Sequence, residues 1–190
     1  TGADDDVTAG ADQTGAVTED ATATTATGTI AGSDADDASS LAYTGDATGT
    51  YGAIAVVSGS GAWTYTLSNS DADTTALDAG DSVTDTFTMT VTDSASGETD
   101  TMAVTITITG ANDAPSAGSD GTGAVTEDAS TSTSTGSISA TDADDAAAFT
   151  YSGDATGTYG AIAVDSAGAW TYTLSNSDAD TTALDAGDSV

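Results

Sequence analysis

The sequence contains no lysine, arginine, histidine or cysteine, and its single proline is Pro115. Without histidine, cysteine or lysine, the chain has no zinc-binding imidazole, no thiol nucleophile and no amine for a Schiff base. Without lysine or arginine it has no side chain to hold phosphate, which argues against nucleic acid and anionic membrane surfaces as partners. No apolar run approaches the roughly 18 residues of a membrane-spanning helix, so we expect no direct membrane contact.

Acidic residues dominate the charge. There are 31 of them among 190 residues, and the formal net charge is −31. Self-repulsion of this size opposes a compact state, so bound divalent cations, high salt or solvation of a well-spread surface must offset it. High charge and few aromatic residues would suit a disordered chain. Short alternating apolar runs separated by turn residues favour a folded β protein instead.

The sequence repeats itself with a period of about 108 residues, and one residue is lost before the third matching segment. The matching segments are Gly15–Asp20 with Gly123–Asp128, Thr50–Val56 with Thr158–Val164, and Trp63–Leu67 with Trp170–Leu174. This period is too long for a solenoid coil and suits one small β domain per repeat. We therefore predict a first repeat over 1–108 and a second over 109–190, which lacks the last two strands of the first.

Alternating runs in the first repeat predict seven strands. These runs are residues 15–18, 28–32, 41–44, 51–56, 62–67, 84–92 and 101–109. The predicted core consists of Val17, Ile30, Leu41, Tyr43, Ile54, Val56, Trp63, Tyr65, Leu67, Leu77, Phe87, Met89, Val91, Val104, Ile106 and Ile108. Short strands separated by regular turns, around one central tryptophan, predict an all-β chain of tandem immunoglobulin-like Greek-key sandwiches.

Carboxylates concentrate in the predicted loops. If the chain enters each repeat at one pole and leaves at the other, strand direction alternates and every loop belongs to a known pole. Acids that follow the first and fifth strands of one repeat then face the seam Thr109–Pro115, and acids of the next repeat face it from the other side. The candidate ligands at this seam and its equivalents are Glu19, Asp20, Asp71, Asp73, Asn112, Asp113, Asp142, Asp144, Asp145, Asp34, Asp36, Asp37, Asp4, Asp5, Glu127 and Asp128.

Oxygen-only ligand sets select hard cations, and Ca²⁺ accepts the irregular sites that loops offer. We therefore predict Ca²⁺ as the bound cofactor. No EF-hand loop is present. The alternative, that acids collect in loops because strands are apolar, stays open for any single aspartate. We interpret Asp12 and Asp46 in this second way, as solvated acids.

Six motifs in this order resemble the VCBS-type repeat: Gly-Ala-Val-Thr-Glu-Asp, Asp-Ala-Asp-Asp, Gly-Thr-Tyr-Gly-Ala-Ile, Gly-Ala-Trp-Thr-Tyr-Thr-Leu, Ala-Leu-Asp-Ala-Gly-Asp and Ile-Thr-Gly-Ala-Asn-Asp-Ala-Pro. The resemblance covers nearly the whole chain. It implies cadherin-like sandwiches in long tandem arrays, as in the extender region of giant bacterial RTX adhesins, including ice-binding ones. It also implies type I secretion to the cell surface and rigidification by Ca²⁺.

The resemblance assigns roles to some candidate ligands. Glu19 and Glu127 are similar to the glutamate of the first strand in cadherin-like sites, and Asn112-Asp113 is similar to the linker ligands. Asp142-x-Asp144 is similar to the Asp-x-Asp of the following domain. Asp4-Asp5-Asp6 departs from the usual Asn-Asp-Ala-Pro seam, and the incomplete second repeat departs from the family pattern too.

These features favour an extracellular, non-catalytic stalk segment whose partners are the neighbouring repeats of the same chain. One alternative is a sandwich module that binds glycans or proteins, or that forms filaments when other copies of the chain supply the missing strands. Ice contact by the threonine-rich runs 22–29 and 130–135 is disfavoured because these runs are too short for a regular lattice. Paired carboxylates could serve glycoside hydrolysis, but they lie on small poles without a cleft, so we predict no enzyme.

Overall fold

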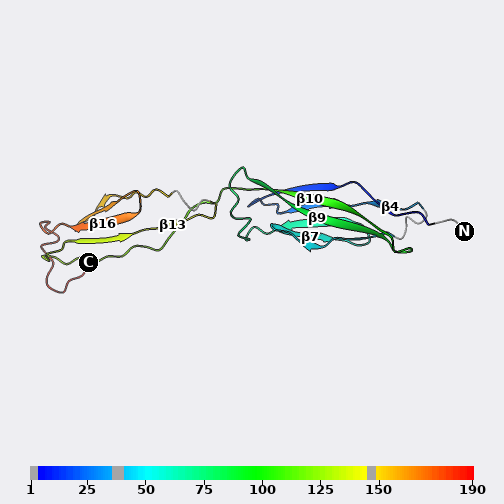
Figure 1. Cartoon of the computed structure of the whole chain (residues 1–190). Coiled ribbons are helices and arrows are strands. Elements are labelled where there is room, and N and C mark those ends of the chain that lie inside the picture. The colour runs from blue at the N-terminus through cyan, green and yellow to red at the C-terminus, as the bar shows by residue number, and fades with distance from the viewer. Residues whose placement is uncertain (1–3, 36–40, 145–148) are drawn as a thin grey trace. The chain divides into compact units, whose positions relative to one another are not determined.

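The computed structural model describes residues 4–35, 41–144 and 149–190, and all of the regular elements that it assigns in these ranges are β-strands. This confirms the all-β prediction. The chain divides into two compact units, Thr1–Asp113 (unit 1) and Ala114–Val190 (unit 2), which are described separately (Figure 1). That residues 1–108 and 109–190 are the repeats stays a prediction. Within the described ranges, no helix has the length and apolar character to cross a membrane.

Two four-stranded sheets form unit 1. The first sheet has the order β2 (Gln13–Thr18), β10 (Thr99–Thr109), β9 (Ser82–Asp93), β5 (Leu41–Thr44). The second has the order β3 (Thr25–Thr29), β8 (Ala62–Leu67), β7 (Gly52–Val56), β6 (Ala47–Thr48). A short ladder joins β1 (Thr8–Ala9) to β4 (Gly32–Ser33). Strands β2 and β10 run parallel, and the other pairs are antiparallel, as expected for an immunoglobulin-type sandwich.

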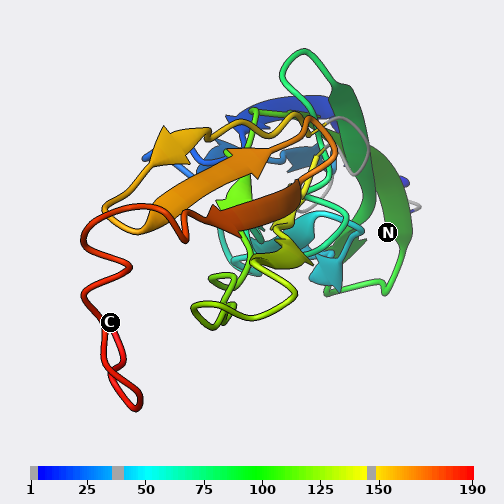
Figure 2. The same ribbon diagram turned by 90° about the vertical axis from the view of Figure 1, so that its left-hand side faces the viewer.

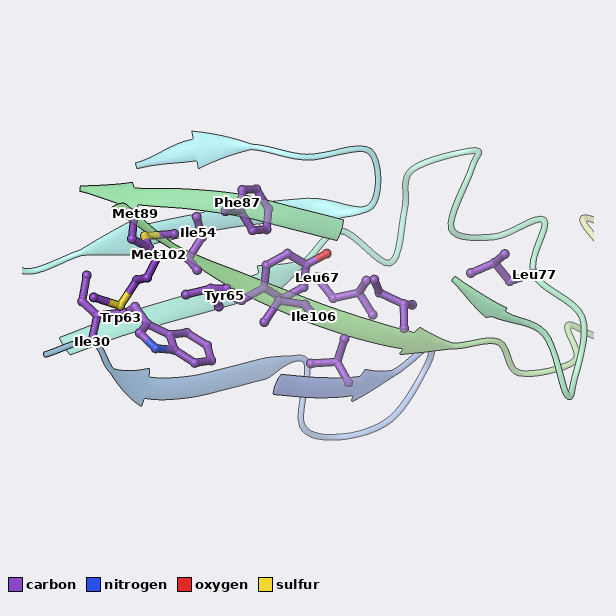
Figure 3. Packing of buried hydrophobic residues seen from close by; sticks show 13 residues of the cluster. Ile30, Ile54, Trp63, Tyr65, Leu67, Leu77, Phe87, Met89, Met102 and Ile106 are labelled. Atoms are coloured by element: carbon purple, nitrogen blue, oxygen red, sulfur yellow. The ribbon is translucent and has the colours of Figure 1, made fainter. Parts of the chain in front are cut away.

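The core of unit 1 lies between these two sheets. Along β9 and β10, threonines alternate with apolar residues, so one face of the sheet is polar and the other is buried. Trp63 and Tyr65 on β8 point toward Met102 and Ile106 on β10 (Figure 3). The predicted core is buried except for Leu41, Tyr43 and Val56, which are half-buried; Val7 and Met102 join it.

Unit 2 repeats only part of this architecture. Its four-stranded sheet has the order β12 (Thr133–Ser137), β16 (Ala169–Leu174), β15 (Gly160–Val164), β14 (Ala155–Thr156), seen face-on in Figure 2. A short ladder joins β11 (Ser116–Ala117) to β13 (Ala140–Thr141). Trp170 lies opposite Gly136 just as Trp63 lies opposite Gly28, so this sheet has the register of the β3-β8-β7-β6 sheet.

The other sheet has no counterpart among the described residues of unit 2. In unit 1, β2 pairs with β10 and β5 pairs with β9. The sequence given for unit 2 runs to Val190, the equivalent of Val83 near the start of β9. Residues 121–126 and 149–152, which correspond to β2 and β5, are not strands in this structure. The core face of the unit 2 sheet borders a cavity of about 1030 Å³.

Candidate metal-binding poles

The best-defined candidate ligand is Glu19, at the end of β2. Because β2 runs parallel to β10, both strands end at the same pole of unit 1. The N–H of Glu19 donates to the carbonyl of Thr109 (2.9 Å), and its Oε2 accepts from the N–H of Ala111 (3.1 Å). Its side chain is only 2% exposed. Glu19 is therefore a buried carboxylate held against the segment that leaves β10.

The loop before β9 reaches the same pole. The N–H of Gly110 donates to the carbonyl of Asp81 (3.0 Å), and a Cβ at Gly110 would lie 2.6 Å from the carbonyl oxygen of Leu77. Only glycine permits this close approach. Next along the chain, the Asn112 side-chain amide donates to the carbonyl of Asp113. We call Glu19, Asp20, Leu77–Asp81 and Gly110–Asp113 the exit pole.

Asp71 and Asp73, also proposed as ligands, have a local role. Oδ1 of Asp71 accepts from the N–H of Asp73 (3.1 Å), and the Asp71 carbonyl accepts from the N–H groups of Thr74 and Thr75 (3.1 and 2.9 Å). Both aspartate side chains are exposed. These bonds shape the turn, and a metal-binding role for either residue stays a prediction.

Asp20 and its counterpart Asp128 have left-handed backbones, with φ of 53° and 54°. Aspartate tolerates this conformation better than most side chains because its short polar group can bond locally. The same turn appears in both units, where the N–H groups of Ala21 and Ala129 lie 3.4 Å from the carbonyls of Thr18 and Thr126. Turn geometry thus explains the aspartate after each glutamate without a metal.

At the opposite end of unit 1, which we call the entry pole, Asp4–Thr8 and Asp34 meet Glu98–Asp100. A hollow of about 500 Å³ is lined by Asp6–Thr8 and Glu98–Asp100. The Asp100 carboxylate accepts from the N–H groups of Ala9 and Thr101 (both 2.8 Å), and these bonds hold the pKa of Asp100 below its usual value. Asp36 and Asp37 lie outside the described residues.

Glu98 is the acid of the entry pole with a raised pKa. Loss of hydration raises the pKa most, and the negative charges of Asp6, Asp4 and Asp34 raise it further. Its Oε2 is buried without a hydrogen-bond partner among the described residues. The pole therefore disfavours the ionised form of Glu98.

Glu98→Gln should raise the melting temperature of unit 1 at pH 7 in low salt and EDTA. A carboxyl group whose pKa is raised by folding contributes stability when protonated and loses it as pH rises through the folded pKa, so the variant avoids a charge that neutral pH imposes. The gain should vanish near pH 4 and shrink in high salt. Calorimetry at pH 4 and pH 7 measures it; an equal gain at both would contradict the charge explanation.

In unit 2, Oδ1 of Asp142 accepts from the N–H of Asp144 (3.2 Å), and both side chains are half-buried. Glu127 is half-buried and Asp128 is exposed. Asp145 lies outside the described residues. The gathering of ligands from both units at the seam stays a prediction.

The donor chemistry of the poles fits Ca²⁺, because every candidate donor is an oxygen. Within the described ranges, however, no three acidic side chains converge closely enough to hold one metal ion. The exit pole offers the buried Glu19 carboxylate beside Asn112 and Asp113. One unit thus supplies part of a ligand set.

Other acids left out of the candidate set bond to the backbone as Asp100 does. Asp12 and Asp46 are exposed, in agreement with their interpretation as solvated acids, and they also accept from the N–H groups of Ala103 (2.8 Å) and Val56 (2.5 Å). Asp93 is 2% exposed and accepts from the N–H groups that follow it in the turn. Backbone amides satisfy these carboxylates.

The most consequential residue that the sequence reasoning missed is Asp85, on β9. It is 4% exposed and lies between the sheets, where it accepts from the N–H groups of Thr50 (2.9 Å) and Tyr51 (3.1 Å) and from the hydroxyl of Tyr65 (2.9 Å). Burial first, and the hydrogen bond to Asp85 second, raise the pKa of Tyr65 well above its usual value. The sequence could have revealed this, because Asp85 lies two positions before Phe87 on the same strand. Residues two apart on a strand face the same side, so the carboxylate of Asp85 had to lie on the buried face.

The chain is similar in sequence to one family of domains and in structure to cadherin extracellular domains. The model of a family described as bacterial cadherin-like domain matches residues 4–110. The chain is similar to Drosophila N-cadherin EC1-4, with TM-score 0.54, 19% identity, and coverage of 94% of this chain and 42% of that one. It is also similar to extracellular cadherin domains 1-4 of protocadherin gamma B7, with TM-score 0.50, 14% identity, and coverage of 94% and 43%.

The chain therefore spans about two fifths of the length of these two structures. At such identities the likeness shows the fold alone, which is a cadherin-like sandwich of the immunoglobulin type. No curated protein matches the chain.

Proposed function

Because the chain belongs to the bacterial cadherin-like domain family, we propose that it is a non-catalytic extender segment of a large extracellular bacterial adhesin, made rigid by Ca²⁺ at the junctions between repeats. Cadherin-like domains are in general structural and adhesion modules, and they are typically extracellular. The VCBS-type motifs support the narrower assignment to an RTX adhesin stalk. Its partners are then the neighbouring repeats of the same polypeptide.

The observation that carries the proposal is the placement of Glu19. Its carboxylate is 2% exposed and bonded to Ala111, where the polypeptide leaves β10. Burying a negative charge is costly unless it is hydrogen-bonded and paired with a positive charge, and the chain contains no lysine, arginine or histidine to pair with Glu19. A bound cation supplies that charge.

Each residue has a defined part in this function. Glu19, Asn112 and Asp113 would hold Ca²⁺ from one repeat, and residues equivalent to Asp142 and Asp144 would hold it from the next. Ca²⁺ links the carboxylates of neighbouring repeats and neutralises their repulsion. The N–H of Ala111 donates to the Glu19 carboxylate, and the N–H of Glu19 donates to the carbonyl of Thr109. These two hydrogen bonds orient the segment that carries Asn112 and Asp113.

Calorimetry and small-angle scattering test this function in EDTA, Ca²⁺, Mg²⁺ and NaCl at matched ionic strength. We expect Ca²⁺ to raise the melting temperature more than Mg²⁺ or NaCl does, and one site at about ten times its dissociation constant to add about 1.4 kcal/mol. We also expect Ca²⁺ to narrow the distribution of distances between the units. Equal effects of all the salts would mean charge screening and would refute the proposal.

A matched pair of variants locates the effect. Glu19→Gln and Asp12→Asn each remove one charge and keep an oxygen that can accept the backbone bond made to Ala111 or Ala103. Only Glu19→Gln should reduce the Ca²⁺-induced rise in melting temperature. An equal reduction in both variants would mean that the response depends on net charge alone.

The alternative of a glycan-binding module gains no support from the tryptophans. Trp63 and Trp170 are both buried, so neither offers a stacking surface for a sugar. Binding of the chain on a glycan array would revive that alternative.

A further inference from the structure

A threonine lies buried in the loop that follows β8 in unit 1 and in the loop that follows β16 in unit 2. Thr74 and its counterpart Thr181 are both 0% exposed. Oγ1 of each is buried and has no hydrogen-bond partner among the described residues, and the same is true of Oδ1 of Asn69 and Asn176. We propose that each loop encloses an ordered internal water molecule, bound to the threonine hydroxyl and to the asparagine side-chain carbonyl.

The two loops, which we call the turn loops, have the same sequence and the same backbone hydrogen bonds. They comprise residues 68–77 and 175–184. Each begins with a serine whose N–H donates to the carbonyl of a tyrosine on the neighbouring chain segment at 2.9 Å, Ser68 to Tyr51 and Ser175 to Tyr159. The bonds that close the turns agree as well, with N–H donors and carbonyl acceptors Thr75 to Asp71 (2.9 Å), Thr182 to Asp178 (3.0 Å), Leu77 to Thr74 and Leu184 to Thr181 (both 3.1 Å). The same buried atoms are therefore left unbonded in two separately packed loops.

Burial of the threonine comes from the turn loop and the sheet to which it is joined. Leu77 is 7% exposed, whereas its counterpart Leu184 is half-buried. Thr181 is nevertheless as fully buried as Thr74. The packing that covers Leu77 is therefore not what encloses the hydroxyl, and bulk solvent reaches the hydroxyl in neither unit.

The hydroxyl does not take the local bond that its neighbour takes. Threonine side chains in turns commonly donate to a nearby backbone carbonyl. Thr75 donates in this way to Ala72 (3.4 Å), and Thr182 donates to Ala179 (3.2 Å). Thr74, one position earlier, makes no such bond to any residue that the structure describes. Since buried polar atoms nearly always have a partner and an unbonded one is costly, its partner comes from outside the chain.

Water fits the chemistry of these two atoms. The carbonyl oxygen of Asn69 can only accept, whereas the hydroxyl of Thr74 can donate or accept. One water can bond to both atoms, and an internal water typically makes about three hydrogen bonds. A cation would find two neutral oxygens there. The nearby carboxylate of Asp71 is exposed and bonded to the N–H of Asp73, so it adds no charge inside the loop.

The water would support the exit pole of unit 1 from beneath. The carbonyl of Thr74 accepts from the N–H of Leu77 (3.1 Å), and Gly110 lies directly against the carbonyl of Leu77. A water that holds Thr74 thus helps to fix the segment on which Gly110 rests. This role does not depend on whether the poles bind a metal.

Crystal structures of the 190-residue chain, grown in EDTA with sodium and with rubidium, test the site directly. We expect a density peak within hydrogen-bond distance of Oγ1 of Thr74 and Oδ1 of Asn69, an equivalent peak at Thr181, and no anomalous rubidium signal at either. In solution, oxygen-17 relaxation dispersion should count one fewer long-lived water in Thr74→Val and an unchanged number in the control Thr75→Val. Turn loops without density, a rubidium signal, or an unchanged count in Thr74→Val would overturn the proposal.

The direction of a stability change gives a second test. Valine has nearly the shape of threonine and lacks the hydroxyl. If water bonds to the hydroxyl, Thr74→Val should lower the melting temperature of unit 1, because a buried hydrogen bond is lost. If the hydroxyl is dry, the same substitution removes an unbonded polar atom and should raise the melting temperature, which would contradict the proposal. Thr74→Ser keeps the hydroxyl and should keep the full count of long-lived waters; a lower count would also contradict it.

Discussion

Replacing Asp85 with alanine should lower the free energy of unfolding of unit 1 by about 3–5 kcal/mol. The substitution removes a buried acceptor and leaves the N–H groups of Thr50 and Tyr51 and the hydroxyl of Tyr65 without it. Each buried donor that loses its partner costs about 1–3 kcal/mol. Water entering the space would recover part of that cost. Chemical denaturation, followed by the fluorescence of Trp63 in a chain carrying Trp170→Phe, measures the loss.

Two comparisons separate this network from a general charge effect. Asp85→Asn keeps one acceptor oxygen and should cost less than alanine. Asp46→Asn is the matched control, because Asp46 is exposed and bonds one backbone N–H. Its effect should stay within about 1 kcal/mol. A gain in stability in Asp85→Ala, as expected from relieving a net charge of −31, would contradict the network.

The Tyr65 hydroxyl reports on the same contact. Burial and Asp85 raise its pKa, so the folded state favours neutral tyrosine. Stability from this preference is present below the ordinary tyrosine pKa of about 10 and is lost as pH rises toward the folded value. A titration of Asp85→Asn followed by the assigned NMR signals of the Tyr65 ring should show Tyr65 ionising at lower pH than in the original chain, since one cause of the shift is weakened.

Strands with alternating large apolar residues could be predicted from the sequence. Residues 41–44 and 62–67 were placed at the observed bounds of β5 and β8, and the two long strands were found within a few residues. The strand predicted over 28–32 is wrong in its bounds, because β3 covers Thr25–Thr29. That segment has no large apolar side chain, and its position is set by pairing with β8. Hydrophobic periodicity gives no signal there.

The two-residue strands were missed for a related reason. The β1–β4 ladder consists of two residue pairs, and β6 adds two residues to β7. Elements this short have no periodicity, and they exist because a neighbouring backbone is already in place. Tertiary context decides them.

The sequence predicted which residues carry the oxygen ligands of the candidate site. It could not predict which of these residues bind a metal and which accept hydrogen bonds from the backbone. Loop acids can be located from sequence, but their partners lie far along the chain. The bond between Asp12 and Ala103 spans 91 positions, as does that between Asp100 and Ala9. Whether a carboxylate holds a metal or a backbone N–H depends on such contacts. Asp20 shows the same limit, because its backbone conformation explains it as well as a ligand role would.

Trp63→Ala should destabilise unit 1 by about 3–5 kcal/mol, the usual cost of truncating a buried tryptophan. Its indole occupies the centre of the core, 2% exposed, between β3 and β10 (Figure 3). Gly28 on β3 lies opposite it, and a Cβ there would lie 2.5 Å from the indole Cζ2. Gly28→Ala should therefore cost about 1–3 kcal/mol through overpacking.

Together the two substitutions should cost less than the sum of their separate effects. Removing the indole clears the space that the new methyl group needs, so Gly28→Ala becomes nearly neutral in the Trp63→Ala background. A double-mutant cycle by denaturant unfolding should give a coupling of about 1–3 kcal/mol. Gly59→Ala, with nothing within 4 Å of the added atom, is the control. Additive effects would mean that the indole moves aside to admit the methyl.

Gly136 and Trp170 form an equally close pair in unit 2. If the indole can move aside, Gly136→Ala should cost less than Gly28→Ala, because the face that carries Trp170 borders a cavity.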